Sequence, residues 1–307
     1  ELGSGALTQH PSFKQLPNSM SPVEKFKAAL SGSEIQVLHQ CLKQAMQPVP
    51  KDSVSWYLGG SQTATGRLTP LHAEALQKLS SDWTHLPFGL RWDTQEGTPT
   101  SRSLMLAQWA QRLHALGYVT GWRNEKFSYW KDEVIGLGQQ SLEPTSLLPV
   151  AFEMERSAFR FFGLRSHAVH VNGFTNEGHL WCGRRALTKP TDPGMLDNLA
   201  AGGLPVGESL QTCSVREMAE EAGISEALAL TAAPYGNVST CRAVATGWHH
   251  ETLWVYNLLV PPDVAPINQD GEVSEFACMS PKQVVEAIAN QAFTVDAACV
   301  LAQGVLN

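Results

Sequence analysis

Hydrophobic residues recur at intervals of three to four positions in several parts of the chain. Ser21-Pro22 opens the first of these runs with a capping residue and a proline, and Pro48 and Pro50 end the second run. This spacing predicts helices over residues 22–30, 34–46, 70–79, 104–116, 209–222 and 283–290.

Shorter apolar segments, bounded by Gly, Pro, Asn or Asp, are typical of strands. The pairs Asn172-Gly173 and Asp270-Gly271 and the segment 176–178 predict turns between some of them. The predicted strands are residues 54–58, 118–122, 159–162, 166–171, 180–184, 252–260 and 272–278.

The pattern changes near the middle of the chain. Pro144 and Pro149, with polar residues between them, predict a linker over 139–149. A length of 307 residues predicts about two domains, at roughly 100–200 residues per domain. Residues 20–145 predict a smaller α+β domain in which no motif indicates a role, and 151–307 alternate strands with helices, which predicts an α/β sandwich.

Residues 1–19 are polar and rich in Gly, Ser, Gln and Pro. They contain no apolar stretch of the roughly 7–15 residues that a secretory signal needs. We expect them to be a flexible arm or a leftover from recombinant expression, with Met20 as the natural start. They are therefore excluded from the fold prediction.

The composition narrows the classes of function. The chain has 22 Lys and Arg against 29 Asp and Glu, a net charge of −7, which argues against binding nucleic acid or an anionic membrane. Its 43% hydrophobic and 17% charged residues are typical of a folded protein, and no apolar run approaches the roughly 20 residues of a membrane span. Six cysteines without zinc or C-x-x-C spacing predict free thiols in a reducing compartment, so we expect the cytoplasm. Monomer and homodimer both stay open.

One predicted helix, 209–222, carries an unusual set of acids. Glu217, Glu220 and Glu221 are related by i, i+3 and i+4 and are expected to share a face, where like charges repel one another. In an arbitrary helix such residues form a solvated surface. A divalent cation would turn the repulsion into attraction, and a cluster of carboxylate oxygens suits Mg²⁺ or Mn²⁺. Arg216 is placed to pair with Glu208 or Glu217 and to orient a carboxylate.

The surrounding residues follow the pattern G-x5-E-x7-R-E-U-x-E-E-x-G-U, in which U is a bulky apolar residue. The fixed identities would coincide by chance in on the order of 10⁻⁹ of windows at typical residue usage. This pattern is the Nudix box, so residues 151–307 resemble a Nudix hydrolase domain. The matching positions are Gly202, Glu208, Arg216, Glu217, Met218, Glu220, Glu221, Gly223 and Ile224.

The resemblance implies a Nudix α/β/α sandwich with a mixed sheet, and Mg²⁺- or Mn²⁺-dependent attack of water on a small-molecule diphosphate. It also implies that Glu217, Glu220 and Glu221 are catalytic metal ligands, one of them being the general base. The carbonyl of Gly202 is a further metal ligand, and Glu208 is a structural or outer one. Members of the family use one more acid downstream of the box. Glu272 and Glu275 are the candidates, and we expect Glu275 to be catalytic.

Basic residues upstream of the box predict the phosphate-binding side of the site. Arg184, Arg185 and Lys189 fit phosphate oxygens, although solvated loop charges are the alternative. The lead-in R-R…K…P-G-M-L-D-N…A-G-G and the additional N-terminal domain resemble a Nudix subfamily related to thiamine pyrophosphokinase. This resemblance implies hydrolysis of thiamine diphosphate, or of its oxythiamine and oxothiamine analogues, to the monophosphate. Pro190 and Asp192 depart from the usual K-Q-T-Y-P-G lead-in.

Three alternatives remain open at the level of sequence. Hydrolases of nucleoside diphosphate derivatives, such as ADP-ribose or NADH, share the same box. An isopentenyl-diphosphate isomerase shares the fold but usually has a degenerate box. A non-catalytic ligand sensor typically loses box glutamates, whereas this chain retains all of them.

Overall fold

The computed structural model describes residues 20–94, 97–130 and 149–307. The predicted arm at 1–19 and most of the predicted linker at 139–149 lie outside these residues. None of the helices within the described ranges is both long and apolar enough to cross a membrane.

A mixed seven-stranded sheet forms the centre of the C-terminal half. Its main strands follow the order β11-β12-β7-β8-β13, while β10 pairs with β7 and β9 pairs with β8. Strand β12 runs parallel to β7, and the other pairs are antiparallel. The strands are β7 (Arg165–Phe174), β8 (Leu180–Arg185), β9 (Leu196–Asp197), β10 (Ala200–Gly203), β11 (Ala233–Val244), β12 (Gly247–Leu259) and β13 (Val273–Met279).

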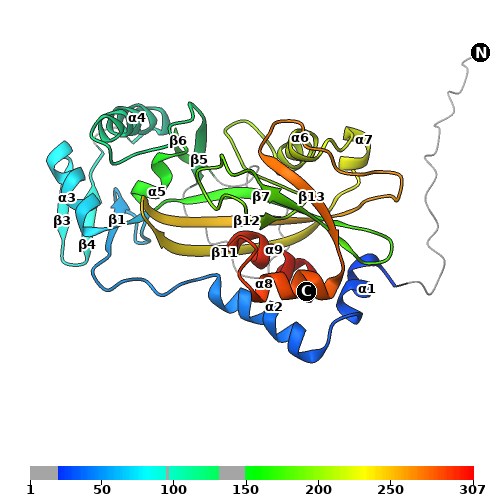
Figure 1. The fold of residues 1–307 in the computed structure, drawn as a ribbon. Helices are drawn as coiled ribbons and strands as arrows, with labels where there is room; N and C mark the ends of the chain where they lie inside the picture. The colour runs from blue at the N-terminus through cyan, green and yellow to red at the C-terminus, as the bar shows by residue number, and fades with distance from the viewer. Residues whose placement is uncertain (1–19, 95–96, 131–148) are drawn as a thin grey trace, which may run out of the picture.

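Helices cover both faces of this sheet (Figure 1). On one face, α6 (Leu210–Ala222) and the short α7 (Glu226–Ala229) pack through residues such as Met218 against Val169 and Val171. On the other face lie α8 (Pro281–Ala289) and α9 (Val295–Leu306). The α/β/α sandwich predicted from the box is therefore confirmed.

The N-terminal half contains a separate four-stranded sheet, ordered β2-β1-β4-β3, in which only β1 and β4 are parallel. Its core gathers the indoles of Trp56, Trp83, Trp92 and Trp109, which contact one another edge-on or tilted. This arrangement agrees with the predicted α+β class. The elements are β1 (Val54–Leu58), β2 (Gly66–Leu68), α3 (Pro70–Leu79), β3 (Trp83–Leu86), β4 (Gly89–Trp92) and α4 (Pro99–Ala115).

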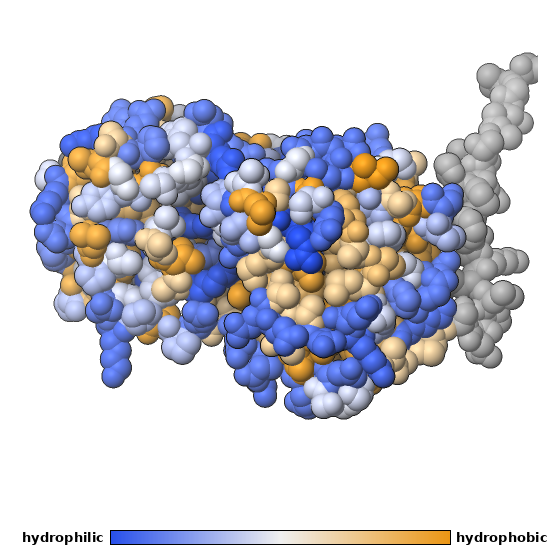
Figure 2. Space-filling model, viewed as in Figure 1, coloured by the Kyte–Doolittle hydropathy of each residue, from blue (hydrophilic) through white to orange (hydrophobic). Residues whose placement is uncertain are grey.

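The hydrophobic contacts cross the predicted division between the halves. Helices α1 (Pro22–Ala28) and α2 (Gly32–Gln44) place Phe26 and Leu38 in the core beneath the large sheet, beside α8 and α9. The N-terminal core in turn takes in residues of β6 (Val150–Glu155), which pairs with β5 (Lys126–Trp130), and of α5 (Ala158–Phe162). The division at 145–151 stays a prediction. In the space-filling view, a band of hydrophilic residues follows the boundary between the two halves (Figure 2).

Several local predictions were wrong. Residues 159–162 form helix α5 instead of a strand, because a short apolar run suits either element and Gly163, at φ 60°, ends a helical turn there. Residues 118–122 do not form the predicted strand. Gly117, just before them, and Gly121, within them, both have positive φ, which interrupts an extended backbone. The predicted turn at Asn172-Gly173 lies inside β7, where Leu199 packs closely against the glycine.

Candidate active site

The box residues lie on a strand, a loop and a helix that follow one another directly. Strand β10 holds Gly202 in register with Val169 of β7, and the loop after it leads into α6. The hydroxyl of Ser209 caps this helix by accepting the backbone N–H of Thr212 at 3.0 Å. Gly223, at φ 64°, ends it in the left-handed conformation.

Arg216 connects three of the box carboxylates. Its guanidinium donates two hydrogen bonds to Glu208, at 2.8 and 3.0 Å. The Nη1 atom also donates to Glu217 Oε1 at 2.8 Å and to Glu220 Oε2 at 3.0 Å. One positive charge therefore bridges the two acids that face the cavity described below and fixes their orientation.

The carboxylate of Glu217 lies directly over the α-carbon of Gly202, so that any Cβ at this position would overlap the carboxylate. The Glu217 side chain is only 12% exposed. Burial raises its pKa, an effect that the contact with Arg216 partly opposes. The glycine thus allows a buried, charge-bearing oxygen to approach the backbone of the loop.

The three box glutamates do not share one open face, contrary to the expectation from spacing. Glu221 is 8% exposed and accepts the backbone N–H of Ala201 at 2.8 Å, whereas the Glu220 side chain is 51% exposed. Residues at i+3 and i+4 differ by about 100° around a helix, so Glu217 lies between an outer and an inner neighbour. Burial, and next the charge of Glu217, raise the pKa of Glu221 well above its usual value.

A cavity of about 330 Å³ lies beside the box loop. Glu217, Glu220 and Gly202 line it, while Glu221 does not. Asp270 and Glu272, in the loop just before β13, add two further carboxylates to its wall. The cavity is within the range of about 300–1,000 Å³ that is typical of small-molecule sites.

The predicted basic residues divide between the cavity and the outer surface. Arg185 and Lys189 line the cavity, where Arg185 pairs with Asp197 at 2.8 Å and Lys189 pairs with Glu272. Burial alone would raise the pKa of Glu272, but Lys189 outweighs it and the pKa lies below its usual value.

Arg184 and Glu275 lie outside this cavity. They pair with each other at 2.6 Å, and the Glu275 side chain is 61% exposed. Successive residues of a strand point to opposite faces, and a register shift between Val273 and Glu275 separates this acid further from Glu272. Of the two downstream candidates, only Glu272 therefore faces the cavity.

Arg123 and Glu125 of the N-terminal half line the same cavity, as do Arg156 and Arg160 of the segment 151–163 that packs against that half. No sequence signal pointed to them, because they belong to no motif and reach the site only through tertiary contacts. Among the described residues, the lining contains no Phe, Tyr or Trp.

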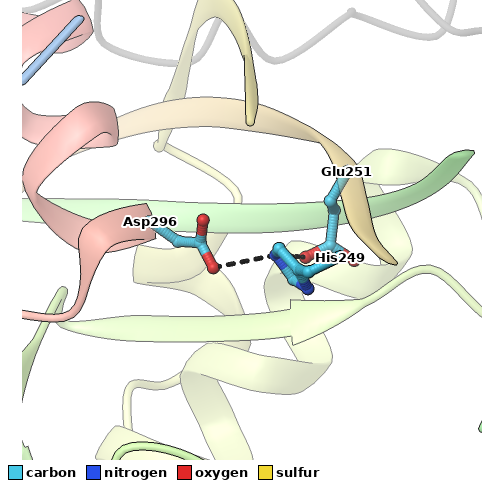
Figure 3. A group of neighbouring side chains, drawn as sticks. All are labelled: His249, Glu251 and Asp296. Carbon is cyan, nitrogen blue, oxygen red and sulfur yellow. Dashed lines mark ion pairs between the residues drawn. The ribbon is translucent and has the colours of Figure 1, made fainter. Parts of the chain in front are cut away.

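A second group of polar side chains lies at another part of the lining, on β12 and at the start of α9 (Figure 3). His249 Nε2 is 3.0 Å from Asp296 Oδ2 and 3.6 Å from Glu251 Oε2. Within the described ranges, these residues are the one set of at least three His, Cys, Asp or Glu ligand atoms that lie within 4.8 Å of one another. Arg242 already holds Asp296 with two hydrogen bonds at 2.7 and 2.9 Å, so one of the two carboxylates of this group has a counter-charge without a metal ion. His249 and His250 precede the predicted strand at 252–260, but both lie within β12.

The donors around the box suit a hard divalent cation. Glu217, Glu220, Glu272 and the Gly202 carbonyl supply only oxygen atoms, which are the ligands that Mg²⁺ and Mn²⁺ prefer. Burial raises the pKa of Glu217 and of Glu221, and a bound cation would favour the charged form of both acids. Fold and site together define an α/β/α sandwich domain with a cluster of oxygen donors, although within the described ranges no three carboxylates around the box bring their oxygen atoms within 4.8 Å of one another.

Part of the chain is similar to a known protein family. Residues 164–299, slightly less than half of the chain, match the family model described as the NUDIX domain. The matched range includes the whole box and the cavity-lining residues of β7, β12 and α9, but none of the lining residues from the N-terminal half.

Two plant proteins are similar over a larger part of the chain. Nudix hydrolase 24, chloroplastic, from Arabidopsis thaliana is 36% identical over 201 residues, which cover 64% of this chain and 52% of the relative. Nudix hydrolase 20, chloroplastic, from the same plant is 37% identical over 198 residues, covering 64% and 50%. The chain thus spans about half the length of these relatives. Among solved structures, the MutT protein from Methanosarcina mazei Go1 aligns with 45% of this chain and 90% of its own, at 17% identity and a TM-score of 0.37.

Proposed function

We propose that the protein is a divalent-metal-dependent pyrophosphohydrolase that splits the diphosphate of a small organic substrate. The observation that carries this proposal is the cavity in which Glu217 and Glu220 of the box meet Glu272 and several basic side chains. Carboxylates for the cation and cations for the phosphates are the two requirements of this chemistry. The similarity to two Nudix hydrolases supports the same assignment.

The residues of the chain take distinct roles in this proposal. Glu217, Glu220 and the Gly202 carbonyl would hold Mg²⁺ or Mn²⁺, with Glu221 and Glu272 as further candidates. The bound ion supplies charge neutralisation and an acidified water. Glu217 is buried with a raised pKa, which suits a group that accepts a proton from water near neutral pH. The catalytic role of Glu275 stays a prediction, and the position of Glu272 makes it the stronger candidate.

For the substrate, we propose thiamine diphosphate or its oxidised analogues. The lead-in sequence that resembles the thiamine-related subfamily supports this choice. A second support comes from Glu251 and Asp296, which place carboxylates at another part of the cavity. Such acceptors suit a cationic or amino-substituted heterocycle better than a second phosphate. For the cellular location, six free thiols support a reducing compartment, and the cytoplasm stays our prediction.

A substrate panel tests the proposal. Thiamine, oxythiamine and oxothiamine diphosphates, ADP-ribose, NADH and nucleoside triphosphates are incubated with the protein and Mg²⁺, and the phosphorylated products are identified. We expect the thiamine-type compounds to give the monophosphate with the highest kcat/KM. Preferential turnover of ADP-ribose or NADH would replace the thiamine assignment. Tight binding without any product would point to a ligand sensor instead.

Substitution of a box acid tests the site itself. Glu220→Gln removes a charge that faces the cavity, and we expect kcat to fall by at least about 10²-fold, the scale of losing one transition-state stabiliser. Glu226→Gln, on the exposed start of α7, serves as the matched control and should retain wild-type turnover. Full Mg²⁺-dependent turnover of Glu220→Gln would contradict the assignment.

A further inference from the structure

The basic residues of the cavity differ in how far their charges are already compensated. Arg185 is paired with Asp197 and Lys189 with Glu272. Within the described part of the chain, the Arg123 side chain forms no ion pair or hydrogen bond, although it lines the cavity. Arg123 lies outside the matched range 164–299, and its charge helps to lower the pKa of Glu272, so it is a basic lining residue whose known partner acts on it through charge alone.

The segment that carries Arg123 is attached directly to the box loop. The Lys126 carbonyl accepts the backbone N–H of Val206 at 2.9 Å, and the ring of Phe127 fills the space where a side chain at Gly203 would stand. The backbone N–H of Arg123 is itself held by Glu155 at 3.0 Å. Arg123 thus projects from a fixed support beside the proposed metal ligands.

Arg156 lies on the same support. Its guanidinium pairs with Glu125 and lies 5.0 Å from the centre of the Phe127 ring, which orients it. Arg123, Arg156 and Glu125 together contribute a net charge of +1 to the wall. Arg160 also lines the cavity, but its helix α5 packs against the start of β12, where Glu251 and Asp296 supply negative charge. A phosphate is therefore better placed at Arg123 and Arg156.

We propose that Arg123 and Arg156 form a phosphate-binding wall, which contacts the diphosphate of the substrate while the box residues hold the cation. The inference rests on the proposed function and gives the N-terminal half a direct role in binding. Guanidinium groups match phosphate oxygens in charge and in planar, two-pronged geometry. Glu125, Glu217 and Glu272 are carboxylates of the same lining, and a bound cation would offset their repulsion of the ligand.

Binding of a non-hydrolysable diphosphate tests the wall without relying on turnover. Calorimetry measures the affinity of imidodiphosphate in the presence of Mg²⁺ for wild type, Arg123→Ala and Arg156→Ala. We expect the dissociation constant to rise at least tenfold in each variant and to recover partly in Arg123→Lys. Arg91→Ala is the control, because Arg91 also belongs to the N-terminal half but pairs with Asp93 outside the cavity.

The outcomes separate this inference from the proposed function. Unchanged affinity in both alanine variants, or no binding to wild type, would contradict the proposal that Arg123 and Arg156 bind phosphate. Arginine-dependent binding by a protein that hydrolyses none of the panel substrates would support the wall and refute the hydrolase. Where an active substrate is found, Arg123→Ala should raise KM at least tenfold and change kcat less. Arg123 is exposed, and none of the ion pairs or side-chain hydrogen bonds among the described residues includes its guanidinium, so thermal unfolding of this variant should match wild type.

Discussion

Gly202 leaves the space that the Glu217 carboxylate occupies, and this single close approach connects the loop of the box to its helix. A methyl group at Gly202 would force the carboxylate away from the cavity wall. We therefore expect Gly202→Ala to weaken Mg²⁺ binding by about 10–100-fold, as loss of a supporting contact does at metal sites.

Titration of Mg²⁺ against turnover or heat release measures the effect of this substitution. Gly60→Ala is a suitable control, because nothing lies within 4 Å of a Cβ at that position and its φ is not positive. Wild-type Mg²⁺ affinity in Gly202→Ala would show that the Glu217 position does not matter for the ion.

The burial of His250 predicts that the unfolding free energy of the protein depends on pH. Burial, followed by the charges of Arg165 and Arg67, lowers its pKa to about 3. The neutral ring accepts a hydrogen bond from Arg165 Nε at 3.2 Å. Because the unfolded chain binds the proton near pH 6.5, this group's contribution is complete above that pH and is lost as the pH falls towards 3.

Denaturant unfolding at pH 7, 6, 5 and 4 tests this dependence. His250 alone should cost about 1.4 kcal/mol of unfolding free energy per pH unit below 6.5. In His250→Gln the slope should decrease by that amount, while His85→Gln, at an exposed position, should keep the wild-type slope. Equal slopes in all three proteins would exclude a buried neutral imidazole.

Residue identity and spacing were enough to locate the acids of the box. They were not enough to say which acids face the cavity, since Glu221 turns towards the sheet and Glu275 towards solvent. Arg123 and Arg156 escaped prediction altogether, because the packing of β5 against the box loop brings them to the site.

Among the elements, helix α6 was predicted closely, at 209–222 against the observed 210–222. Helix α6 has Ser209 at its start and Gly223 at its end, and both act as the sequence indicates. Helix α9 was missed because its residues are almost all apolar, so that no polar face marks the helical period. Strand β11 was missed for a related reason, since Pro234 and Gly236 interrupt its pattern at a register shift.

A buried ion pair joins two of these missed elements. Arg242 of β11 holds Asp296 in the first turn of α9, and both side chains are mostly buried. Asp296→Asn would leave a buried guanidinium without its counter-charge, which typically costs about 3–5 kcal/mol. Burial alone would raise the pKa of Asp296, but His249 and Arg242 lower it well below its usual value. The contribution is therefore present at neutral pH and is lost only as the pH falls below about 4.

Urea unfolding at pH 7 measures this loss. Asp263→Asn provides the comparison, because Asp263 is exposed and surface substitutions usually change stability by less than about 0.5 kcal/mol. If both variants unfolded at the same urea concentration, the ion pair would contribute nothing to the attachment of α9.

At the scale of the whole molecule, the first helix belongs to the core of the opposite half. Phe26 is fully buried and meets the ring of Phe174 edge-on, with centroids 5.8 Å apart. Phe26→Ala should lower the unfolding free energy of the sandwich by about 3–5 kcal/mol, the usual cost of truncating a buried Phe. Thermal unfolding checks this value, with Leu104→Ala as the exposed control on α4. A melting temperature within a degree of wild type would show that α1 is dispensable.

The contact of Phe127 with Gly203, and of Lys126 with Val206, has a consequence for how such proteins change over time. The two halves meet at the loop that carries the proposed metal ligands, so one half is not expected to function with an unrelated partner half. A chimera whose N-terminal half comes from a relative should retain activity only if an aromatic side chain of similar size occupies position 127. A substitution at residues 126–127 is therefore expected to occur together with a compensating substitution at residues 203–206.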